Sequence, residues 1–356
     1  MERKLATIRR IDNLEPILGK DLIELATLDG WQAIVKKNEY DVGDLVVYCE
    51  IDSFLPVQEE YEFLRSRCFK STKNLGDGFR IKSMKMGGVL SQGLVLPISK
   101  DTIKGIGSQL EVGLDLTEHL GIQKYEKPIP ANLAGKIRGN FPSFIPKTDQ
   151  ERIQNCFRTL QNKWMDYNWE RTLKLDGSSM TMYCKLEKSE HPDYGVLWQW
   201  LEGVCSRNLD LKIEDNDGNA FVEMWKKLHE KIRDYCATFN RQLAFQMELM
   251  GSGIQRNREK LSTHEVYVYD IFDIDTQKYL SATERQEICK QLQINHCPDL
   301  GNIKFDSDIT IKQLLDMSDI PSMNNPIAEG IVYKSIENPE ISFKVINNKF
   351  LIQSEE

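Results

Sequence analysis

Glycine turns divide the first 118 residues into short β-type runs, and this pattern restricts the possible folds more than any other feature of the chain. The segment DLIELATLDGWQAIVKK places two such runs around Asp29-Gly30, a dipeptide that favours a tight hairpin. Further runs follow in VGDLVVYCEIDSFLP and GFRIKSMKMGGVLSQGLVLPI, where Gly87-Gly88 indicates another turn. The pattern predicts an all-β domain over residues 1–118.

About five short strands in a segment of this length are typical of a small β-barrel. An OB-like fold is our favoured interpretation, and another barrel or a sandwich fits the pattern equally well. Residues 119–147 contain four of the twelve prolines and show little periodicity. We therefore interpret them as a linker.

The remaining residues, 148–356, alternate between strand-like and helix-like segments and predict an α+β domain. Thr148 and Glu151 have the spacing of a capping box, so a helix is expected through ERIQNCFRTLQNKW. The amphipathic segment VEMWKKLHEKIRDYCATF predicts a second helix. The segments LAFQMELMG, EVYVYDIFDI, AEGIVYKS and ISFKVINNKFL predict strands.

The net charge of −8 argues against a protein that covers nucleic acid with one large basic face. Any contact with nucleic acid should therefore be a local basic strip. No apolar run approaches the ~20 residues needed to cross a bilayer, and the N-terminus lacks the apolar core of a secretory signal. The eight cysteines and five histidines show no zinc or disulfide spacing. These features predict a reduced, cytoplasmic protein.

The segment ERTLKLDGSSMTMY holds the first candidate for chemistry. Lys174 and Asp176 fall on one face of a strand-like run, and Leu173 and Leu175 fall on the other. Gly177 follows directly. The pattern K-x-D-G taken alone leaves two readings open, since Lys174 is either a strand lysine paired with Asp176 or a nucleophile.

Further short motifs follow in a fixed order along the predicted strands. They are VCSRN with Arg207 and Asn208, FQMELMG with Glu248, VYVYDIF with Tyr269 and Asp270, AEGIVYK with Glu329 and Gly330, and SFKVIN with Lys344. This order resembles that of the covalent nucleotidyltransferases, which include polynucleotide ligases and mRNA capping enzymes. The motifs VCSRN and FPSFIPKTDQERIQN are most similar to those of the ATP-dependent RNA ligases of the Naegleria and Deinococcus type.

The resemblance extends over essentially the whole chain and implies a domain order. It implies an OB-like β-barrel at 1–118, the linker at 119–147, and a nucleotidyltransferase domain at 148–356 with an ATP-grasp-like arrangement of antiparallel sheets flanked by helices. Classical DNA ligases and capping enzymes carry the OB domain after the catalytic domain, and too few residues follow Lys344 for such a domain. Many ligases have K-x-K in the last motif, whereas FKVI offers a single lysine and leaves Lys349 as a distant second candidate.

The resemblance also implies a reaction. Lys174 would attack ATP to form a lysyl-AMP intermediate, and the AMP would pass to a 5′-phosphate that a 3′-hydroxyl then attacks. A free lysine has a pKa of about 10.4, so nearby cations must favour the neutral amine. Lys344 and a Mg²⁺ or Mn²⁺ ion, held through its waters by Asp176, Glu248 and Glu329, would serve this purpose.

The implied nucleotide site adds residues around this centre. It comprises Lys174, Leu173, Gly177, Arg207, Glu248, Tyr269, Asp270, Glu329, Gly330 and Lys344. Gly177 and Gly330 would allow the backbone to approach the nucleotide, and Tyr269 would stack on adenine. A core tyrosine, a solvated Glu248 at a strand edge and a surface ion pair of Arg207 remain the alternatives.

Contact with RNA is expected from Arg207, Asn208, Arg80 and Lys82, with Lys85 as a possible extension. The alternative for the lysines of FRIKSMK is an ordinary solvated strand face. We expect a monomer that acts in RNA repair on nicked duplexes or paired ends and does not bind membranes. A DNA ligase, a capping guanylyltransferase and a non-catalytic nucleic-acid-binding relative are the competing interpretations.

Overall fold

The computed structural model describes residues 3–99, 110–126, 135–191 and 195–354. The chain forms two compact units, Met1–Ile129 together with Asn348–Glu356, and Pro130–Asn347. The proline-rich part of the expected linker, residues 127–134, lies outside the described residues. The limits expected for the two domains remain predictions. None of the described helices combines the length and the apolar composition that crossing a membrane requires.

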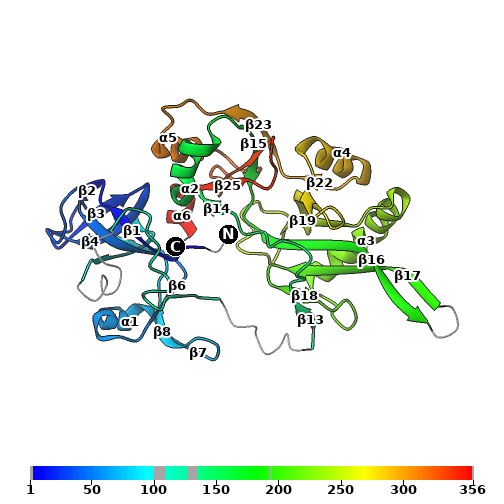
Figure 1. The fold of residues 1–356 in the computed structure, drawn as a ribbon, viewed down its shortest axis with the longest axis horizontal. Helices are drawn as coiled ribbons and strands as arrows, with labels where there is room; N and C mark the ends of the chain where they lie inside the picture. The colour runs from blue at the N-terminus through cyan, green and yellow to red at the C-terminus, as the bar shows by residue number, and fades with distance from the viewer. Residues whose placement is uncertain (1–2, 100–109, 127–134, 192–194, 355–356) are drawn as a thin grey trace. The chain divides into compact units, whose positions relative to one another are not determined.

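The first unit consists of small antiparallel sheets (Figure 1). In order of pairing, the sheets contain β1 (Ala6–Arg10), β5 (Leu45–Glu50) and β11 (Gly93–Pro97); β2 (Asn13–Pro16), β3 (Ile23–Leu28) and β4 (Trp31–Lys36); β10 (Val89–Ser91) and β9 (Met84–Met86); and β12 (Gln123–Lys124), β6 (Ser53–Pro56), β8 (Gly76–Arg80) and β7 (Phe69–Thr72). The described residues of the unit also form a 3₁₀ helix (Glu59–Leu64), α1 (Arg65–Cys68) and the C-terminal α6 (Asn348–Ser354).

Local turn chemistry explains the first hairpin. Asp29 and Gly30 have φ values of 47° and 81° and join β3 to β4. Two positive φ angles in succession suit the twist of a two-residue hairpin, so the prediction for this dipeptide is confirmed. The turn between β9 and β10 is confirmed in the same way, with φ values of 60° and 82° at Gly87 and Gly88.

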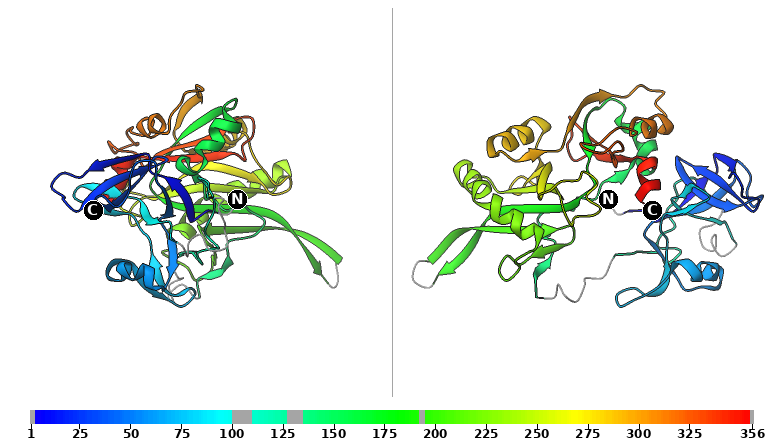
Figure 2. Two further views of the ribbon diagram at one scale, coloured as in Figure 1. Left: turned by 60° about the vertical axis from the view of Figure 1, so that its left-hand side comes forward. Right: turned by 180° about the vertical axis from the view of Figure 1, so that it is seen from behind.

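The described residues of the second unit form two sheets. The larger has the order β13 (Ile137–Asn140), β18 (Leu209–Leu211), β17 (Gly195–Ser206), β16 (Ser178–His191), β19 (Leu243–Met250), β20 (Glu265–Asp273) and β21 (Lys278–Tyr279), with β22 (Asn295–His296) beside β20. The smaller has the order β14 (Glu151–Arg152), β25 (Ser342–Ile346), β24 (Gly330–Ser335), β15 (Asn168–Lys174) and β23 (Asp299–Lys304). Strands β16 and β17 extend beyond their neighbours in the larger sheet (Figure 2).

The helices of this unit are α2 (Ile153–Thr159), a π-helical turn (Leu160–Trp164), α3 (Ala220–Phe239), α4 (Ala282–Leu292) and α5 (Ile311–Met317). The expected α3 is confirmed, and the Asn219 side chain caps its first turn. The expected capping box at Thr148 and Glu151 is wrong. Glu151 lies in β14, and the Thr148 hydroxyl contacts Ser179 Oγ at 3.0 Å. The Thr148 hydroxyl thus contacts a residue distant in the sequence and not the nearby backbone N–H that a capping box requires.

Strand β19 shows how the larger sheet separates core from site. Phe245, Met247 and Leu249 project from one face into an apolar core that includes residues of α3. Side chains alternate along a strand, so Gln246 and Glu248 project from the other face. This alternation explains why a glutamate occurs within an otherwise apolar strand.

Candidate active site

The K-x-D-G motif crosses from one sheet to the other. Lys174 is the last residue of β15 in the smaller sheet, and Ser178 is the first residue of β16 in the larger sheet. Gly177 lies between them and packs closely on β19, because an added Cβ would lie 2.5 Å from the carbonyl oxygen of Leu249. This glycine was expected to make room for a nucleotide. The structure shows a packing reason for the glycine, since it lets the turn after Lys174 lie close to β19, and its approach to a nucleotide remains a prediction.

The smaller sheet contributes two lysines from one face. Lys174 pairs with Gly330, and Lys344 pairs with Val332 two residues further along β24. Residues directly opposite each other project from the same face, and so do residues two apart on a strand. Lys174 and Lys344 therefore share a face. The Lys174 Nζ atom lies 2.8 Å from Oε2 of Glu329, the residue before β24.

The larger sheet contributes Glu248, which the structure brings to the same place. The backbone N–H of Gly177 donates to Glu248 Oε1 at 3.0 Å. This bond fixes the carboxylate beside the turn that follows Lys174. Lys174, Glu248, Glu329 and Asp176 are thus close enough to perturb each other's pKa values.

The carboxylates hold Lys174 in its charged form. Burial lowers the pKa of Lys174, but Glu329, Glu248 and Asp176 raise it by more, so the net shift is upward. Burial raises the pKa of Glu248 to about 7, opposed by Lys174 and assisted by Glu329. Burial also raises the pKa of Asp176, again with a contribution from Glu329. The three carboxylates form a negative centre that a cation would stabilise.

Lys344 shows the opposite perturbation. Its half-buried ammonium group has a pKa lowered to about 7, first by burial and then by Lys174 and Arg152. The sequence led us to expect that Lys344 would lower the pKa of Lys174. Lys174 and Lys344 do repel each other, although the carboxylates give Lys174 a net upward pKa shift, and the role of Lys344 alongside a divalent cation remains a prediction.

The donor chemistry fits a hard divalent cation held through water. Within the described residues no group of three or more His, Cys, Asp or Glu side chains is placed to ligate a metal directly. Asp176, Glu248 and Glu329 nevertheless supply oxygen donors around one point, and their mutual repulsion is what a cation relieves. Their assignment as metal-binding residues remains a prediction.

An apolar cluster lies beside the charged residues. It contains Leu173, Leu175 and Met250, and the partly buried Tyr267 and Tyr269 pack against it. The Tyr269 hydroxyl lies 3.2 Å from Ser179 Oγ, which fixes the orientation of the ring. Leu173 and Tyr269 are therefore near the lysine, and a flat base is the kind of group that such a surface accepts.

Asp270 does not join this group. The pairing of β19 with β20 shifts by one residue between Met247–Val268 and Gln246–Asp270, which leaves Tyr269 as a bulge. The carboxylate of Asp270 forms an ion pair with Lys334 and lies 3.6 Å from Arg285. The structure therefore places Asp270 in a buried charge cluster and does not bring it to Lys174.

Arg207 and Asn208 lie at the surface near the start of the second unit. The guanidinium of Arg207 forms an ion pair with Asp149, and the Lys147 ammonium lies 3.5 Å from Asn208 Oδ1. The Arg207 side chain is 62% exposed, so this is the surface ion pair that the sequence left open as an alternative. A phosphate could displace the Asp149 carboxylate, and the role of both residues in binding remains a prediction.

The residues expected to form the basic strip of the first unit lie in different surroundings. Arg80 bonds to Asp52 at 2.8 Å and lies over the Tyr125 ring at 4.3 Å. Lys82 is exposed and lines a hollow of the same unit. Lys349 belongs to α6, which is grouped with the first unit, and its side chain is exposed.

The structure adds residues that sequence reasoning missed. Arg258 Nε lies 3.4 Å from Asp176 Oδ2, and Arg152 pairs in register with Lys344. Arg258 occurs in the loop after β19. The sequence QRNREK is basic there, but no strand pattern predicts which way its side chains point. Arg152 was assigned to a helix by the capping-box interpretation, which hid its position beside Lys344.

Comparisons with known proteins agree with this geometry. A family model described as RNA ligase matches residues 168–346, and one described as an OB-fold domain matches residues 5–98. The structure of Naegleria gruberi RNA ligase with PPi superposes with a TM-score of 0.77 at 39% identity, covering 99% of each chain. A mutant of that ligase with AMP and Mn superposes with a TM-score of 0.78 at 38% identity, and the match again covers 99% of each chain.

A mutant of the same Naegleria gruberi ligase with ATP and Mn gives a TM-score of 0.77 at 38% identity. It covers 98% of this chain and 99% of the other. A search of curated proteins gave no match.

Proposed function

This chain belongs to the RNA ligase family, and from that membership we propose that it joins RNA ends at the expense of ATP through an AMP group carried on Lys174. The expected order of an OB-fold domain followed by a ligase domain is confirmed. ATP and a divalent cation, Mg²⁺ or Mn²⁺, are the cofactors of this activity.

One observation supports the role of Lys174 most directly. Its amine emerges between two sheets, 2.8 Å from Glu329 and within the field of Glu248 and Asp176. A structural lysine needs one carboxylate, whereas three carboxylates act on this amine, and Arg258 and Lys344 stand beside them. Oxygen donors and cations around one amine suit a site that takes up a divalent cation together with a polyphosphate.

The reaction then divides into three displacements. The Lys174 amine attacks the α-phosphorus of ATP, forming a P–N bond as the bond to the bridging oxygen breaks and pyrophosphate leaves. A 5′-phosphate oxygen of RNA next attacks the same phosphorus and releases the lysine. A 3′-hydroxyl finally attacks the adenylated 5′-phosphate, so that a phosphodiester forms and AMP departs.

Lys174 must lose a proton before the first step, and the carboxylates oppose that loss. A divalent cation held through water by Asp176, Glu248 and Glu329 would neutralise them and would also stabilise charge on the α-phosphate. Glu329 accepts a hydrogen bond from the Lys174 amine and so orients it. Lys344 stands on the same sheet face and would stabilise the phosphate oxygens once they arrive.

Tyr269 and the apolar group around Leu173 form the surface on which we place the adenine. Tyr269 is held through its hydroxyl by Ser179, which in turn contacts Thr148. Arg258, paired with Asp176, would help to orient that carboxylate. Gly330 tolerates no side chain, because a Cβ would collide with the Val345 carbonyl oxygen, and this keeps β24 close to β25 beside Lys344.

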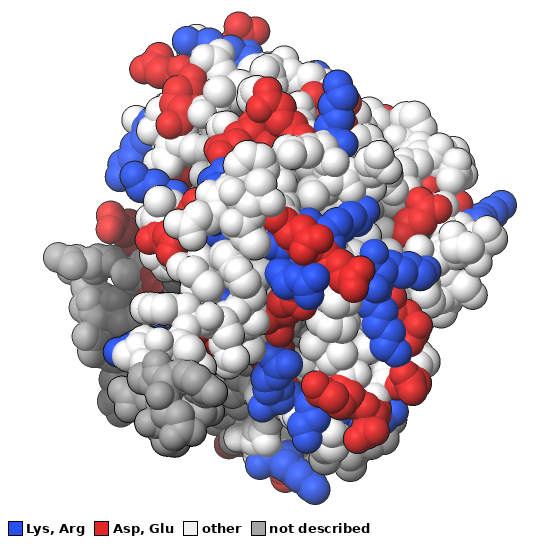
Figure 3. All heavy atoms as spheres, turned by 90° about the vertical axis from the view of Figure 1, so that its right-hand side faces the viewer, with Lys and Arg blue, Asp and Glu red and all other residues white. Residues whose placement is uncertain are grey.

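We further propose that the substrate is a nick with RNA at the 3′-hydroxyl strand, held in part by the first unit. Adenylation needs only ATP and the strands from Lys174 to Lys344, whereas sealing needs two ends held in line, which is worth several kcal/mol. One face of the molecule, seen from the side of α3 and the β16–β17 hairpin, mixes Lys and Arg with Asp and Glu (Figure 3). Mixed charge of this kind offers weak attraction for a phosphate backbone.

The test uses the full-length protein with labelled ATP, GTP or NAD, a divalent cation and nicked duplexes. Label that survives a denaturing gel identifies a covalent enzyme, and the nucleotide that supplies it separates an ATP ligase from a capping guanylyltransferase. Matched nicks with RNA or DNA at the 3′-hydroxyl strand then decide the substrate. Equal sealing of both would defeat the RNA-specific nick, and absence of stable label would defeat the covalent mechanism.

A further inference from the structure

The strongest concentration of positive charge lies in the first unit, away from the reactive lysine in the sequence. Residues 63–86 contain seven Lys and Arg and a single acidic residue, Asp77, in a chain whose net charge is −8. This stretch passes through α1, β7, β8 and β9. An imbalance this local is the signature expected of an acidic protein that contacts a phosphate backbone.

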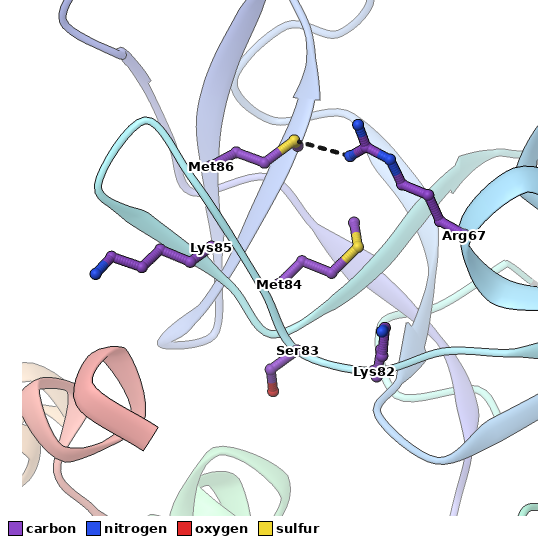
Figure 4. A pocket seen from close by; sticks show the side chains of 6 residues that line it. All are labelled: Arg67, Lys82, Ser83, Met84, Lys85 and Met86. Carbon is purple, nitrogen blue, oxygen red and sulfur yellow. Dashed lines mark hydrogen bonds between the residues drawn. The ribbon is translucent and has the colours of Figure 1, made fainter. Parts of the chain in front are cut away.

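A hollow of about 380 Å³ opens within this stretch and is lined by Arg67, Lys82, Ser83, Met84, Lys85 and Met86. Figure 4 shows Arg67 reaching from α1 toward Met86 on β9, with the Met84 side chain below this contact in the view and the Lys85 side chain on the other side of the strand. The volume is within the range of sites that hold a small molecule or one nucleotide residue.

Arg67 and Lys82 are two of the three cations that line this hollow, and the side chain of the third, Lys85, lies on the other side of the strand (Figure 4). The guanidinium of Arg67 donates to the Met86 sulfur at 3.5 Å. A thioether sulfur is a weak acceptor. Among the described residues neither Arg67 nor Lys82 pairs with a carboxylate. Both cations also act on one buried thiol, because burial raises the pKa of Cys68 while Lys82 and Arg67 lower it. Their positive charges therefore converge.

Arg80 differs from these two residues, although it is equally basic. Its guanidinium is already bonded to Asp52 and stacked on Tyr125. A ligand phosphate would have to break an existing ion pair to reach it. The sequence suggested Arg80 and Lys82 together, and the geometry separates them.

Two methionines give the hollow an apolar side. Met84 and Met86 are half-buried and project from the same face of β9, since they are two residues apart. Thioether side chains are flexible and polarisable and make favourable contacts with aromatic rings. Such a surface accepts the face of any base, whereas a sequence-reading site would present fixed hydrogen-bond donors and acceptors.

We propose that this hollow binds one nucleotide of the RNA substrate, with its phosphodiester between Arg67 and Lys82 and its base or ribose against Met84 and Met86, without regard to sequence. The inference rests on the proposed ligase function and adds to it a specific subsite in the first unit. Charge complementarity selects RNA as the occupant. The apolar side favours a nucleotide whose base is not fully enclosed in a duplex.

The test compares two double variants of the full-length protein that remove the same charge. Arg67→Gln with Lys82→Gln removes two of the three cations that line the hollow, and Lys70→Gln with Lys73→Gln removes two exposed lysines of the same stretch that do not line it. Glutamine keeps the aliphatic stem, so unchanged thermal unfolding is expected for both. We measure the KM for nicked RNA in sealing, and the binding of fluorescent single-stranded RNA by anisotropy across a range of salt.

The KM for RNA should rise roughly tenfold or more in the hollow variant, since a charge-assisted contact is lost, and less than threefold in the control. In the hollow variant the slope of log affinity against log salt should become shallower by the amount that corresponds to about one phosphate contact. Equal losses in the two variants, or wild-type behaviour of the hollow variant, would overturn the subsite.

Two further measurements separate the subsite from the ligase function itself. The KM for ATP in formation of labelled protein–AMP should change less than the KM for RNA; a larger change for ATP would mean that the hollow serves a free nucleotide and would overturn the assignment to RNA. If the wild-type protein seals no RNA ends, the proposed function is refuted. The anisotropy measurement would still decide whether the hollow binds RNA.

Discussion

Strand β15 contributes one residue to each of two clusters of charged residues in the second unit, Lys174 to one and Glu170 to the other, and the two clusters behave differently. The first, which we name the reactive cluster, consists of Lys174, Asp176, Glu248, Glu329 and Lys344. The second, the buried cluster, consists of Glu170, Asp270, Arg285, His296 and Lys334. Both contain lysines paired with carboxylates, and the sequence motifs grouped Asp270 with the first cluster although the structure places it in the second.

Exposure separates the two clusters. In the reactive cluster the side chains of Lys174 and Glu329 are 22% and 17% exposed. In the buried cluster Arg285 is 1% exposed, and it bonds to both Glu170 and His296. A buried charge without a partner destabilises the fold, whereas partly exposed carboxylates can exchange their protein partners for a ligand. The comparison therefore places the chemistry in the cluster that a ligand can reach.

The largest effect should come from removing the nucleophile. Lys174→Ala should reduce labelled protein–AMP by about 10⁴-fold or more, because no other group can form the P–N bond. Labelled ATP followed by a denaturing gel measures it. The variant should keep a cooperative unfolding transition, since Lys174 lies in the half-exposed cluster. Label that persists in this variant would remove Lys174 from its role.

The next effect concerns stability and should arise in the buried cluster. Arg285→Leu leaves Glu170 and Asp270 buried without their arginine partner, and we expect a loss of about 3–5 kcal/mol in the free energy of unfolding. Urea unfolding measures it. Lys312→Leu is the matched control, because its pair with Asp316 is exposed and should matter little. Similar stability of the two variants would show that the buried cluster does not support the fold.

A smaller effect on activity is expected from the carboxylates of the reactive cluster. Glu248→Ala should slow formation of protein–AMP roughly 10- to 100-fold at limiting Mn²⁺, because a group that holds the waters of the cation is lost. Higher Mn²⁺ should partly restore the rate, since weaker binding is offset by concentration. Rates are compared across a metal titration. A wild-type rate at limiting metal would exclude Glu248 from the metal-binding set.

Much of the fold could be predicted where the signal was local. The hairpin at Asp29-Gly30 and the helix that became α3 depend on turn chemistry and on helical periodicity, and neither needs a distant partner. The capping box at Thr148 failed because its hydroxyl contacts Ser179, about thirty residues away in sequence. The end of ISFKVINNKFL also differs, because the strand stops at Ile346 and the chain continues as α6.

The site residues could be predicted where a residue type is unusual for its position and a single explanation accounts for it. Glu248 interrupts an apolar strand, and Lys174 precedes a glycine that the neighbouring strand requires. Asp270 could not be placed, because a one-residue bulge at Tyr269 changes which residues face each other. Arg258 lies in a loop, where no periodicity assigns a direction. Sequence motifs therefore located the centre of the reactive cluster and missed the residues that support it.

The smallest effect should distinguish the clusters by pH. The Arg285 guanidinium donates from Nε to Nε2 of His296 at 3.0 Å, and His296 Nδ1 lies 2.6 Å from the Cys297 carbonyl oxygen. Only a neutral imidazole with its proton on Nδ1 can satisfy both partners. Burial, assisted by Arg285, lowers the pKa of His296 below its ordinary value of about 6.5.

Since the unfolded chain takes up this proton at a higher pH than the folded protein, the free energy of unfolding should fall as the pH drops from about 6.5 through the folded pKa, and should level off below it. The slope for one proton is at most about 1.4 kcal/mol per pH unit. His296→Gln keeps an oxygen that can accept from Arg285 but does not titrate, so its stability should depend less on pH in this window. The other histidines contribute equally to both proteins, and the difference between the two urea-unfolding series isolates His296. Identical slopes would mean that the buried cluster does not sense pH. A difference in slope with unchanged protein–AMP formation near neutral pH would show that this cluster acts on stability and leaves the chemistry to the other.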